Sequence, residues 1–360
     1  MAKLRAALIG TGLIVGNHMQ ALAHEAGRLD LVAAVDTDPV TLDAFGKQYH
    51  VTNLYTDSGA MLAEQRPDLV IIGTPPATHR VLCIEAMEAG TDVLCEKPIA
   101  ASLRELDDIQ AAERRTGRTC TSVFQWRYGS GGQHVRRLIT AGALGRPLVG
   151  VCHTLWYRDM AYYRIPWRGK WRTEIGGTSM GHGIHAMDFF LWLMGDWVEV
   201  QAMLGTLDHD IEVEDVSLAL VRFESGAMGS IVNSAVSPRQ TSYLRLDFQR
   251  ATIELEHLYH YRNDHWRLSI PDGATYTDEL ASWSALGADV EAHQTAQLTA
   301  VLDSLEQGER PLTSGAELRR TMEFMASLYK AAFTRQPVLR GTIGPDDPFY
   351  ASMNGTLAEP

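Results

Sequence analysis

Hydrophobic residues recur along the first third of the chain in short runs that alternate with helical patterns. Strand patterns cover residues 4–10, 31–36, 69–74, 92–97 and 118–124. Amphipathic stretches with helical spacing lie between them, at about 13–27, 39–48, 77–90 and 102–116. Strands that alternate with helices in this way predict βαβ units and a doubly wound parallel sheet.

The pattern changes beyond about residue 145. Strands with alternating polarity at 216–223, 227–236 and 242–248 follow one another with short turns, which is typical of a mostly antiparallel sheet. Two long helical patterns, at about 289–307 and 315–335, follow. The chain is therefore predicted to be an α/β protein with two different sheets.

Composition narrows the class of protein. A chain of 360 residues is long enough for two domains, and 45% hydrophobic with 21% charged residues is ordinary for a globular protein. The formal net charge of −12 argues against a nucleic-acid partner, because such a surface repels phosphates. The four cysteines show no C-x-x-C spacing, and neither a signal peptide nor an apolar run of ~20 residues is evident. These features predict a cytoplasmic protein without a membrane partner.

A glycine-containing loop, "GTGLIVG" at 10–16, directly follows the first strand pattern. Gly10 permits a tight turn, Gly12 allows a pyrophosphate to approach the backbone, and the following helix supplies its dipole. A strict G-x-G-x-x-G motif would have glycine at Val15. The strand–loop–helix context nevertheless predicts dinucleotide binding rather than an ordinary glycine turn. The predicted loop contacts are Gly10, Thr11, Gly12, Leu13 and Ile14.

Asp36 ends the second strand pattern. A carboxylate at this place can accept hydrogen bonds from both ribose hydroxyls of NAD. It would repel the 2′-phosphate of NADP, and no arginine follows in "VDTDP". The sequence therefore predicts NAD rather than NADP, with a simple turn residue as the alternative.

The next two strand patterns end in "GTPPATH" (73–79) and "CEKPIA" (95–100). Ligands of open parallel sheets bind outside the carboxyl ends of the strands. The residues predicted to line the cofactor site there are Thr74, Pro75, His79, Glu96 and Lys97.

Together these motifs resemble the glucose–fructose oxidoreductase/inositol dehydrogenase (Gfo/Idh/MocA) family. The segments "WRGKW" (167–171), "GG…GIHAMD" (176–188) and 292–332 also look like that family, so the similarity covers nearly the whole chain. E-K-P at 96–98 is its most diagnostic part.

The resemblance implies a Rossmann domain over 1–125, a substrate-binding and oligomerisation α/β domain with an open, mostly antiparallel sheet over 126–340, and a tail over 341–360. It implies NAD as cofactor, a small carbohydrate as substrate, and a homodimer or homotetramer. It places Lys97 near the reacting hydroxyl, His185 as general acid or base, and Trp167 and Arg168 along the cofactor.

"GGTSMGHGIHAMDFF" (176–190) spaces His182, His185 and Asp188 three apart, which puts them on one face of a helix. Three interpretations are possible: a metal site, proton transfer, or packing. A neutral imidazole suits proton transfer near pH 7, and the Lys97 ammonium can stabilise an alkoxide. We therefore favour His185 as the proton shuttle, with His182 near the substrate and Asp188 orienting or binding it, and expect no metal. Many relatives carry Asp or Asn where this chain has Gly181, and His182 is the neighbour that could substitute.

Aromatic and basic residues gather in "WYRDMAYYRIPWRGKWR" (156–172). Aromatic faces stack on sugars and arginines bind anionic groups, so Tyr157 and Arg172 are predicted to contact the substrate. The surplus cations Arg158, Arg164, Lys170 and Arg172 have two interpretations of equal weight. They indicate either an anionic substrate, such as a sugar acid, sulfosugar or phosphosugar, or a basic loop at a subunit contact.

The segment "FQWRYG" (124–129) follows the sixth strand pattern along the chain. It predicts Gln125 beside the cofactor and Trp126 and Arg127 beside the substrate. Packing at a domain hinge is the alternative for this segment.

The favoured function is an NAD-dependent dehydrogenase that acts on a sugar hydroxyl. An NAD-dependent glycosidase is the first alternative, in which transient oxidation, elimination, hydration and re-reduction leave no net redox change. A dinucleotide or sugar sensor without catalysis is the second.

Overall fold

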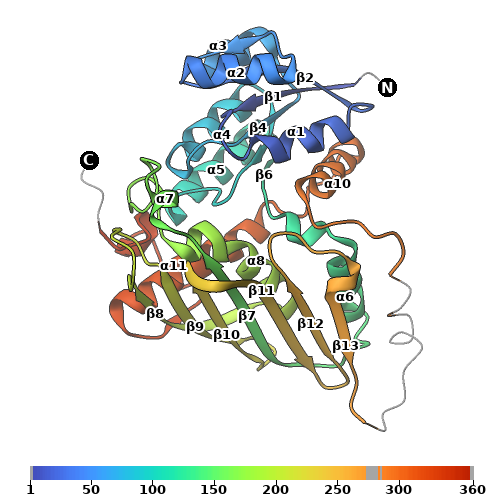
Figure 1. The fold of residues 1–360 in the computed structure, drawn as a ribbon, viewed down its shortest axis with the longest axis vertical. Helices are drawn as coiled ribbons and strands as arrows, with labels where there is room; N and C mark the ends of the chain where they lie inside the picture. Colours follow the sequence, from blue (N-terminus) through green and yellow to red (C-terminus); the bar gives the residue numbers. More distant parts are fainter. Residues whose placement is uncertain (1–2, 273–282, 284–285, 357–360) are drawn as a thin grey trace. The chain divides into compact units, whose positions relative to one another are not determined.

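The computed structural model describes residues 3–272, 283 and 286–356, which divide into two compact units (Figure 1). The first unit comprises Met1–Val123 and Gln294–Arg319, and the second comprises Phe124–His293 and Arg320–Pro360. The chain passes from the first unit to the second after Val123, two residues before the predicted boundary at 125. Residues 294–319 group with the first unit, and the described residues that follow, 320–356, group with the second.

The described strands of the first unit form one parallel sheet in the order β3-β2-β1-β4-β5-β6. The strands are β1 (Leu4–Ile9), β2 (Leu29–Val35), β3 (Leu54–Tyr55), β4 (Leu69–Ile72), β5 (Asp92–Cys95) and β6 (Cys120–Ser122). The helices are α1 (Val15–His24), α2 (Pro39–Tyr49), α3 (Ser58–Gln65), α4 (His79–Glu88), α5 (Leu103–Thr116) and α10 (Gln294–Gln307), with a 3₁₀ turn over Pro76–Thr78. This strand order is that of dinucleotide-binding folds, so the predicted doubly wound sheet is confirmed.

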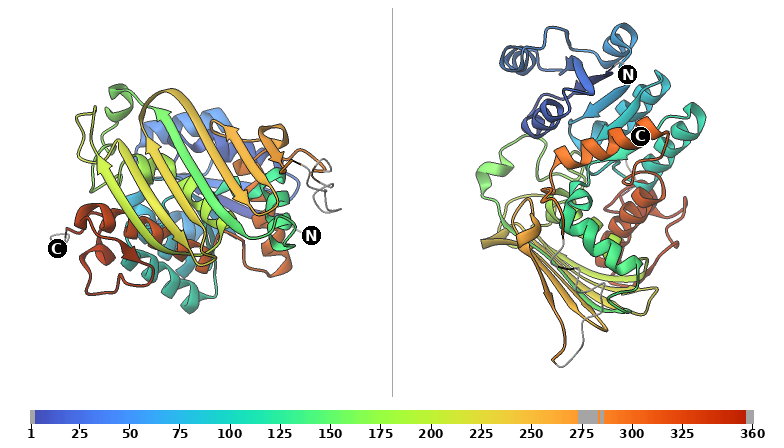
Figure 2. Two further views of the ribbon diagram at one scale, coloured as in Figure 1. Left: turned by 90° about the horizontal axis from the view of Figure 1, so that it is seen from below. Right: turned by 90° about the vertical axis from the view of Figure 1, so that its right-hand side faces the viewer.

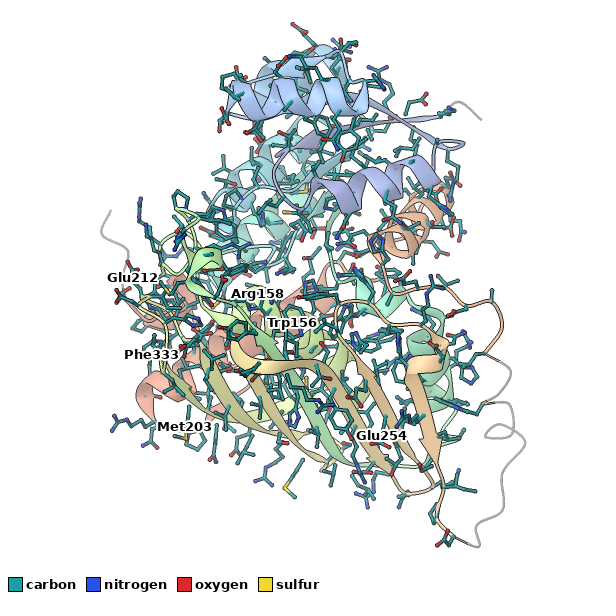
Figure 3. The ribbon with its side chains drawn as sticks, viewed as in Figure 1. Trp156, Arg158, Met203, Glu212, Glu254 and Phe333 are labelled. Atoms are coloured by element: carbon teal, nitrogen blue, oxygen red, sulfur yellow. The ribbon has the colours of Figure 1, made fainter. Side chains whose placement is uncertain are left out.

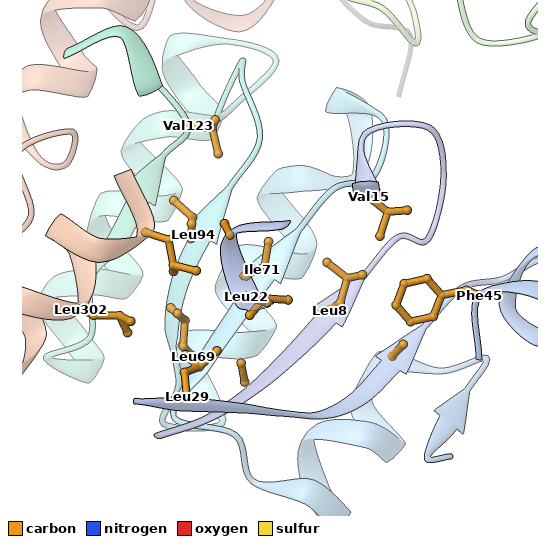
Figure 4. Packing of buried hydrophobic residues seen from close by; sticks show 14 of the residues in the cluster. Leu8, Val15, Leu22, Leu29, Phe45, Leu69, Ile71, Leu94, Val123 and Leu302 are labelled. Carbon is orange, nitrogen blue, oxygen red and sulfur yellow. The ribbon is translucent and has the colours of Figure 1, made fainter. Parts of the chain in front are cut away.

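The apolar strand runs are buried because helices cover both faces of a doubly wound sheet. Leu8 and Ile71 are fully buried in the core that Figure 4 shows, together with Val15 at the start of α1. Leu302 of α10 joins the same core, and Arg28 pairs with Asp303 across a distance of 2.8 Å. These contacts explain why residues 294–319 belong to the first unit.

Side-chain caps define where several helices begin. The Asp38 carboxylate accepts from the backbone N–H groups of Val40 and Thr41 at the start of α2, and Ser102 caps α5 through the N–H of Glu105. Helix α3 and strand β3 were not predicted, because each is too short for its hydrophobic residues to show a clear periodicity.

The described strands of the second unit form a sheet in the order β13-β12-β11-β7-β10-β9-β8-β14. They are β7 (Pro147–Tyr157), β8 (Trp197–Gly205), β9 (Val216–Phe223), β10 (Met228–Ser234), β11 (Val236–Phe248), β12 (Thr252–His257), β13 (Trp266–Ser269) and β14 (Val338–Leu339). β7 and β10 pair in parallel and the other described pairs are antiparallel. The prediction of a mostly antiparallel sheet is confirmed.

Helices cover one face of this second sheet (Figures 1 and 2). The helical elements are the 3₁₀ turns Gln125–Tyr128 and Asn263–His265, α6 (Ser130–Thr140), α7 (Met160–Tyr163), a π-helical turn over Ser179–Gly183, α8 (Ile184–Met194), α11 (Ala316–Thr334) and α12 (Pro348–Ala351). Phe190 of α8 lies over Gly150 and Gly229, where a Cβ atom would come within 2.5 and 2.9 Å of its ring. Glycine in both strands therefore lets α8 approach the sheet closely.

The opposite face of the sheet carries no helix among the described residues (Figure 2). Met203, Leu220 and Met228 are exposed there at 72%, 62% and 59%, and Figure 3 shows Met203 and Glu254 projecting from the sheet. Across the described part of the chain, no helix combines the length and apolar content needed to span a bilayer.

Candidate active site

The loop between β1 and α1 has the geometry of a dinucleotide cradle. Gly10 adopts φ +93°, and a Cβ atom there would lie 2.8 Å from the carbonyl carbon of Gly73, so only glycine fits. A Cβ at Gly12 would meet nothing within 4 Å, and Leu13 is 86% exposed. The outer surface of the loop is therefore open to a ligand.

Asp36 anchors this loop from the end of β2. One carboxylate oxygen accepts from the backbone N–H and the hydroxyl of Thr11, at 2.8 and 2.9 Å, and the other accepts from the N–H of Asp38 at 3.0 Å. Asp36 thus ties the end of β2 to the glycine loop.

His79 joins the loops that follow β4 and β5. Its Nε2 lies 2.9 Å from the carbonyl oxygen of Thr74, and its Nδ1 lies 2.7 Å from that of Pro98. Burial lowers the pKa of His79, although the hydrogen bonds to both carbonyls oppose the shift. Its ring nitrogens face the main chain, and the residue supports two loops in which Thr74 and Lys97 lie.

A buried hydrogen-bonded pair holds the second of these loops. Glu96 Oε1 lies 2.9 Å from Nε2 of His18 on α1, and their side chains are 9% and 2% exposed. Burial alone would raise the pKa of Glu96, but the hydrogen bond and charge of His18 outweigh it and hold that pKa below its usual value. The backbone N–H of Lys97 donates to the same carboxylate at 3.3 Å. His18 was missed, because one histidine in a helical pattern carries no signal of its partner.

In the second unit, the glycine pair Gly176–Gly177 precedes the turn that leads into α8. A Cβ at Gly177 would lie 1.8 Å from the Glu214 carbonyl oxygen. The Glu214 carboxylate accepts from the N–H groups of Gly177 and Ser179 and from the Tyr329 hydroxyl, at 2.9, 3.0 and 3.0 Å. The turn Ser179–Gly183 is π-helical, a geometry that occurs frequently at functional sites.

His182 lies within this π-helical turn, and His185 follows it in α8. The His185 ring stacks on Trp126 at 6.0 Å between centroids and meets Phe124 edge-on at 6.5 Å. The His182 ring lies 5.2 Å from Trp156 and 5.6 Å from Tyr162. The two histidines therefore do not belong to one regular α-helix of the kind that the spacing of 182, 185 and 188 predicts.

Asp188 and Arg127 form a buried pair. Nε and Nη2 of Arg127 donate to the two carboxylate oxygens at 2.7 and 2.6 Å, and the Thr321 hydroxyl donates to the same carboxylate at 2.7 Å. The two side chains are 0% and 1% exposed. The structure thus places both side chains in the interior of the second unit, where each compensates the charge of the other. Among the described residues, no three His, Cys, Asp or Glu side chains gather as metal ligands.

A hydrogen-bonded chain leads from His182 to Glu174. Tyr162 Oη lies 3.1 Å from Nε2 of His182, and Nη1 of Arg168 donates to Tyr162 Oη and, at 3.2 Å, to Glu174. A guanidinium only donates, so the Tyr162 hydrogen is available to His182. Burial raises the pKa of Tyr162 to about 12 against the opposing charge of Arg168, which keeps the phenol protonated at neutral pH. Tyr162 and Glu174 were missed; only the aromatic and basic composition of 156–172 pointed to this region.

The other predicted residues of the second unit differ in exposure. Gln125 and Trp126 are buried, Arg168 lies 4.3 Å from the centroid of the Trp167 ring, and Tyr157 is 46% exposed. Arg172 is also exposed. Tyr157 and Arg172 are therefore accessible to solvent, whereas Gln125 and Trp126 are not.

Comparison with known proteins agrees with this geometry. Residues 4–124 match the model of an oxidoreductase family with an NAD-binding Rossmann fold, and residues 133–254 match the GFO/IDH/MocA C-terminal domain. The chain is 27% identical to D-apiose dehydrogenase of Paraburkholderia graminis, covering 92% of this chain and 88% of the relative. It is 25% identical to D-glucoside 3-dehydrogenase of Escherichia coli, covering 71% and 78%.

Solved structures give the same result. The WlbA dehydrogenase from Bordetella pertussis, in complex with NADH and UDP-GlcNAcA, superimposes with a TM-score of 0.84 at 26% identity, covering 94% of this chain and 99% of that one. The first unit is thus an NAD-binding Rossmann domain, and relatives of the chain are sugar dehydrogenases. The chain belongs to the Gfo/Idh/MocA family of oxidoreductases.

Proposed function

We propose that the protein oxidises a ring hydroxyl of a sugar or sugar derivative to the ketone, with NAD as the oxidant. The observation that carries the proposal is the buried Glu96–His18 pair, which fixes the backbone of Lys97 at the carboxyl end of β5 within an NAD-binding domain. A lysine ammonium at this end of the sheet is suited to stabilising negative charge on a reacting oxygen.

The residues of the first unit fit a bound NAD. Gly10 gives the loop a path that no other residue could follow, Gly12 leaves its surface open, and Asp36 offers a carboxylate to ribose hydroxyls. The same carboxylate disfavours a 2′-phosphate, so we propose a preference for NAD over NADP. The proposed cofactor contacts are Gly10, Thr11, Gly12, Leu13, Ile14, Asp36, Thr74, Pro75, Glu96 and Lys97, with Gln125, Trp167 and Arg168 from the second unit.

Three side chains of the protein assist the chemistry. Bound NAD supplies the acceptor for the hydride that leaves the carbinol carbon. His185 takes the hydroxyl proton as the carbonyl bond forms, and Lys97 stabilises the alkoxide that develops on the oxygen. His182, oriented by Tyr162, contacts the substrate and takes the place of an acid at Gly181.

Single substitutions with matched controls test this proposal. We expect Lys97→Met to lower kcat/KM by about 10²–10³-fold and His185→Asn by about 10²–10⁴-fold, while NADH binding measured by fluorescence changes little in the His185 variant. Lys47→Met and His24→Asn, at solvent-exposed positions, serve as controls. Undiminished turnover in the Lys97 and His185 variants would contradict the proposal, as would a parent protein that binds NADH and oxidises no carbohydrate.

The open sheet face supports a further part of the proposal, a homodimer or homotetramer. Val149, Met203, Leu218, Leu220 and Met228 expose apolar side chains on this face. Such a patch is typical of an interface between subunits. Light scattering after size-exclusion chromatography tests it: we expect an oligomer for the parent and dissociation for Leu220→Lys, whereas a monomeric parent would refute it.

A further inference from the structure

Arg158 directly follows β7, and its backbone is held on both sides. Its N–H donates to the carbonyl oxygen of Ala235 at 2.8 Å, and its own carbonyl oxygen accepts from Nε2 of His209 at 2.8 Å. These main-chain contacts come from two other segments of the second unit. These main-chain hydrogen bonds therefore fix the position of the Arg158 backbone, and no acidic partner of the side chain is needed for this.

The Arg158 guanidinium lies over three aromatic rings. Its central carbon is 5.1 Å from the ring centroid of Trp156, 5.4 Å from that of Tyr162 and 5.8 Å from that of Tyr259. Figure 3 shows Trp156 and Arg158 close together at one end of the sheet. Ring faces attract the cation and hold it without neutralising it.

The hydrogen-bond partners of Arg158 are uncharged. Nη1 donates to the carbonyl oxygen of Tyr157 at 2.7 Å and to Oε1 of Gln240 at 3.3 Å. Within the part of the chain that the structure describes, no carboxylate lies at ion-pair distance from this guanidinium. Its positive charge is thus uncompensated in a protein whose net charge is −12.

The acids nearest in this region are engaged elsewhere. Asp159 accepts from the N–H of Tyr162 at 3.1 Å and caps α7. Asp215 accepts from three successive N–H groups, those of residues 207, 208 and 209. Glu174 pairs with Arg168 at 3.2 Å. The local arrangement therefore neutralises Arg168 and leaves Arg158 available.

The same aromatic rings surround His182. Trp156 and Tyr162, which lie beneath the Arg158 guanidinium, are also the neighbours of the His182 ring, at 5.2 and 5.6 Å between centroids. Tyr259 is 41% exposed and meets Trp156 edge-on at 5.0 Å. An uncompensated cation, an exposed ring and a histidine thus lie together within one unit.

We infer that Arg158 binds the carboxylate of a sugar acid, with Tyr259 stacking on the C–H face of the sugar ring. One uncompensated guanidinium matches one negative charge and the planar fork of a carboxylate. A dianionic phosphate would need a second free cation, and the neighbouring Arg168 is already paired. The inference rests on the proposed function, for which it specifies the substrate class, but it concerns binding and is tested without turnover.

Equilibrium binding in the presence of NADH tests the inference, with D-glucuronate and D-galacturonate compared with D-glucose and D-galactose. We expect the parent protein to bind each uronate at least about tenfold more tightly than its neutral counterpart, as expected for a hydrogen bond to a charged group. Arg158→Gln should remove this difference and leave neutral-sugar binding within about twofold. Arg158→Lys, which keeps the charge, should recover part of it and guards against a folding defect.

Matched variants test whether Arg158 or another cation is responsible for the uronate preference. Arg239→Gln, on an 85%-exposed side chain of the same unit, should change nothing. Loss of the uronate preference in Arg172→Gln but not in Arg158→Gln would overturn the assignment. A parent without any uronate preference, or one that binds glucose 6-phosphate more tightly than glucuronate, would also overturn it. Uronate binding that depends on Arg158 without NADH formation would refute the proposed oxidation but leave this inference standing. NADH formation from a sugar, together with uronate binding that Arg158→Gln leaves unchanged, would do the reverse.

Discussion

The two units hold their candidate site residues in different ways. In the first unit, Asp36 and His79 contact the main chain of neighbouring loops, through the N–H of Thr11 and the carbonyls of Thr74 and Pro98. In the second unit, His182 contacts another side chain, that of Tyr162. The first arrangement follows from strand order, since parallel strands end at one edge, whereas the second depends on partners that no local pattern reveals.

The largest expected effect concerns the buried pair in the second unit. Asp188→Ala should lower the free energy of unfolding by about 3–5 kcal/mol, because Arg127 would be left buried without its counter-charge. Urea unfolding at pH 7 measures this, and the double variant Arg127→Met/Asp188→Leu should recover part of the loss. An Asp188→Ala protein as stable as the parent but impaired in substrate binding would return this residue to the role suggested by the sequence.

The next largest effect on stability is expected at one of two glycines in the loop between β1 and α1. Gly10→Ala should cost about 2 kcal/mol or more in unfolding free energy, because of its positive φ and the clash with Gly73. Gly12→Ala, where the added methyl meets nothing, should change stability by less than about 0.5 kcal/mol but weaken NADH binding. Equal stability losses in the two variants would show that the loop is not the rigid cradle described above.

Acid should destabilise the second unit through His257. Burial, with the nearby charges of His265 and His260, lowers the pKa of His257 to about 3, against about 6.5 in an unfolded chain. Below pH 6.5 the unfolded state therefore binds a proton that the folded state excludes, and stability falls as pH falls.

This pH effect amounts to about 2 kcal/mol between pH 6.5 and 5.0, at a limiting slope of about 1.4 kcal/mol per pH unit. Urea unfolding of the parent and of His257→Phe at both pH values measures it. We expect a shallower pH dependence for the variant, and equal slopes would contradict the assignment of His257 as a buried neutral ring.

The smallest effect concerns cofactor choice in the first unit. Asp36→Asn should lower the ratio of kcat/KM for NAD over NADP by about tenfold, or about 1.4 kcal/mol, because the charge that repels a 2′-phosphate is removed. Asp38→Asn, at the cap of α2, is the matched control and should leave the ratio unchanged. An unaltered ratio in Asp36→Asn would make Asp36 a loop anchor only.

The fold of the first unit could be predicted because buried parallel strands appear as continuous apolar runs. The prediction of strands at 69–74 and 92–97 is confirmed by β4 and β5, and the helix predicted at 39–48 by α2. Helix α6 was not predicted, since Gly131 and Gly132 are poor helix formers. They are required by packing, as a Cβ at either residue would lie within 2.4 Å of Trp266 or Tyr261.

The candidate site was predictable only in part. The glycine loop and E-K-P could be identified because their function depends on backbone path and strand order. The π-helical turn at 179–183, the contact between Tyr162 and His182, and the buried state of Asp188 could not, because each depends on residues far apart in the chain. The type of a residue indicates which chemistry it could perform. Whether its side chain faces a ligand or the core depends on the residues that contact it in the fold.

The most direct test of the central claim is to incubate the purified protein with NAD and a panel of neutral sugars, sugar acids and aryl glycosides. Nicotinamide absorbance and aglycone release would be followed together. The account predicts stoichiometric NADH formation with at least one sugar and no aglycone release. Aglycone release without net NADH would contradict it, and would mean that oxidation is an internal step of a glycosidase in which His182 and Tyr162 supply the additional acid or base.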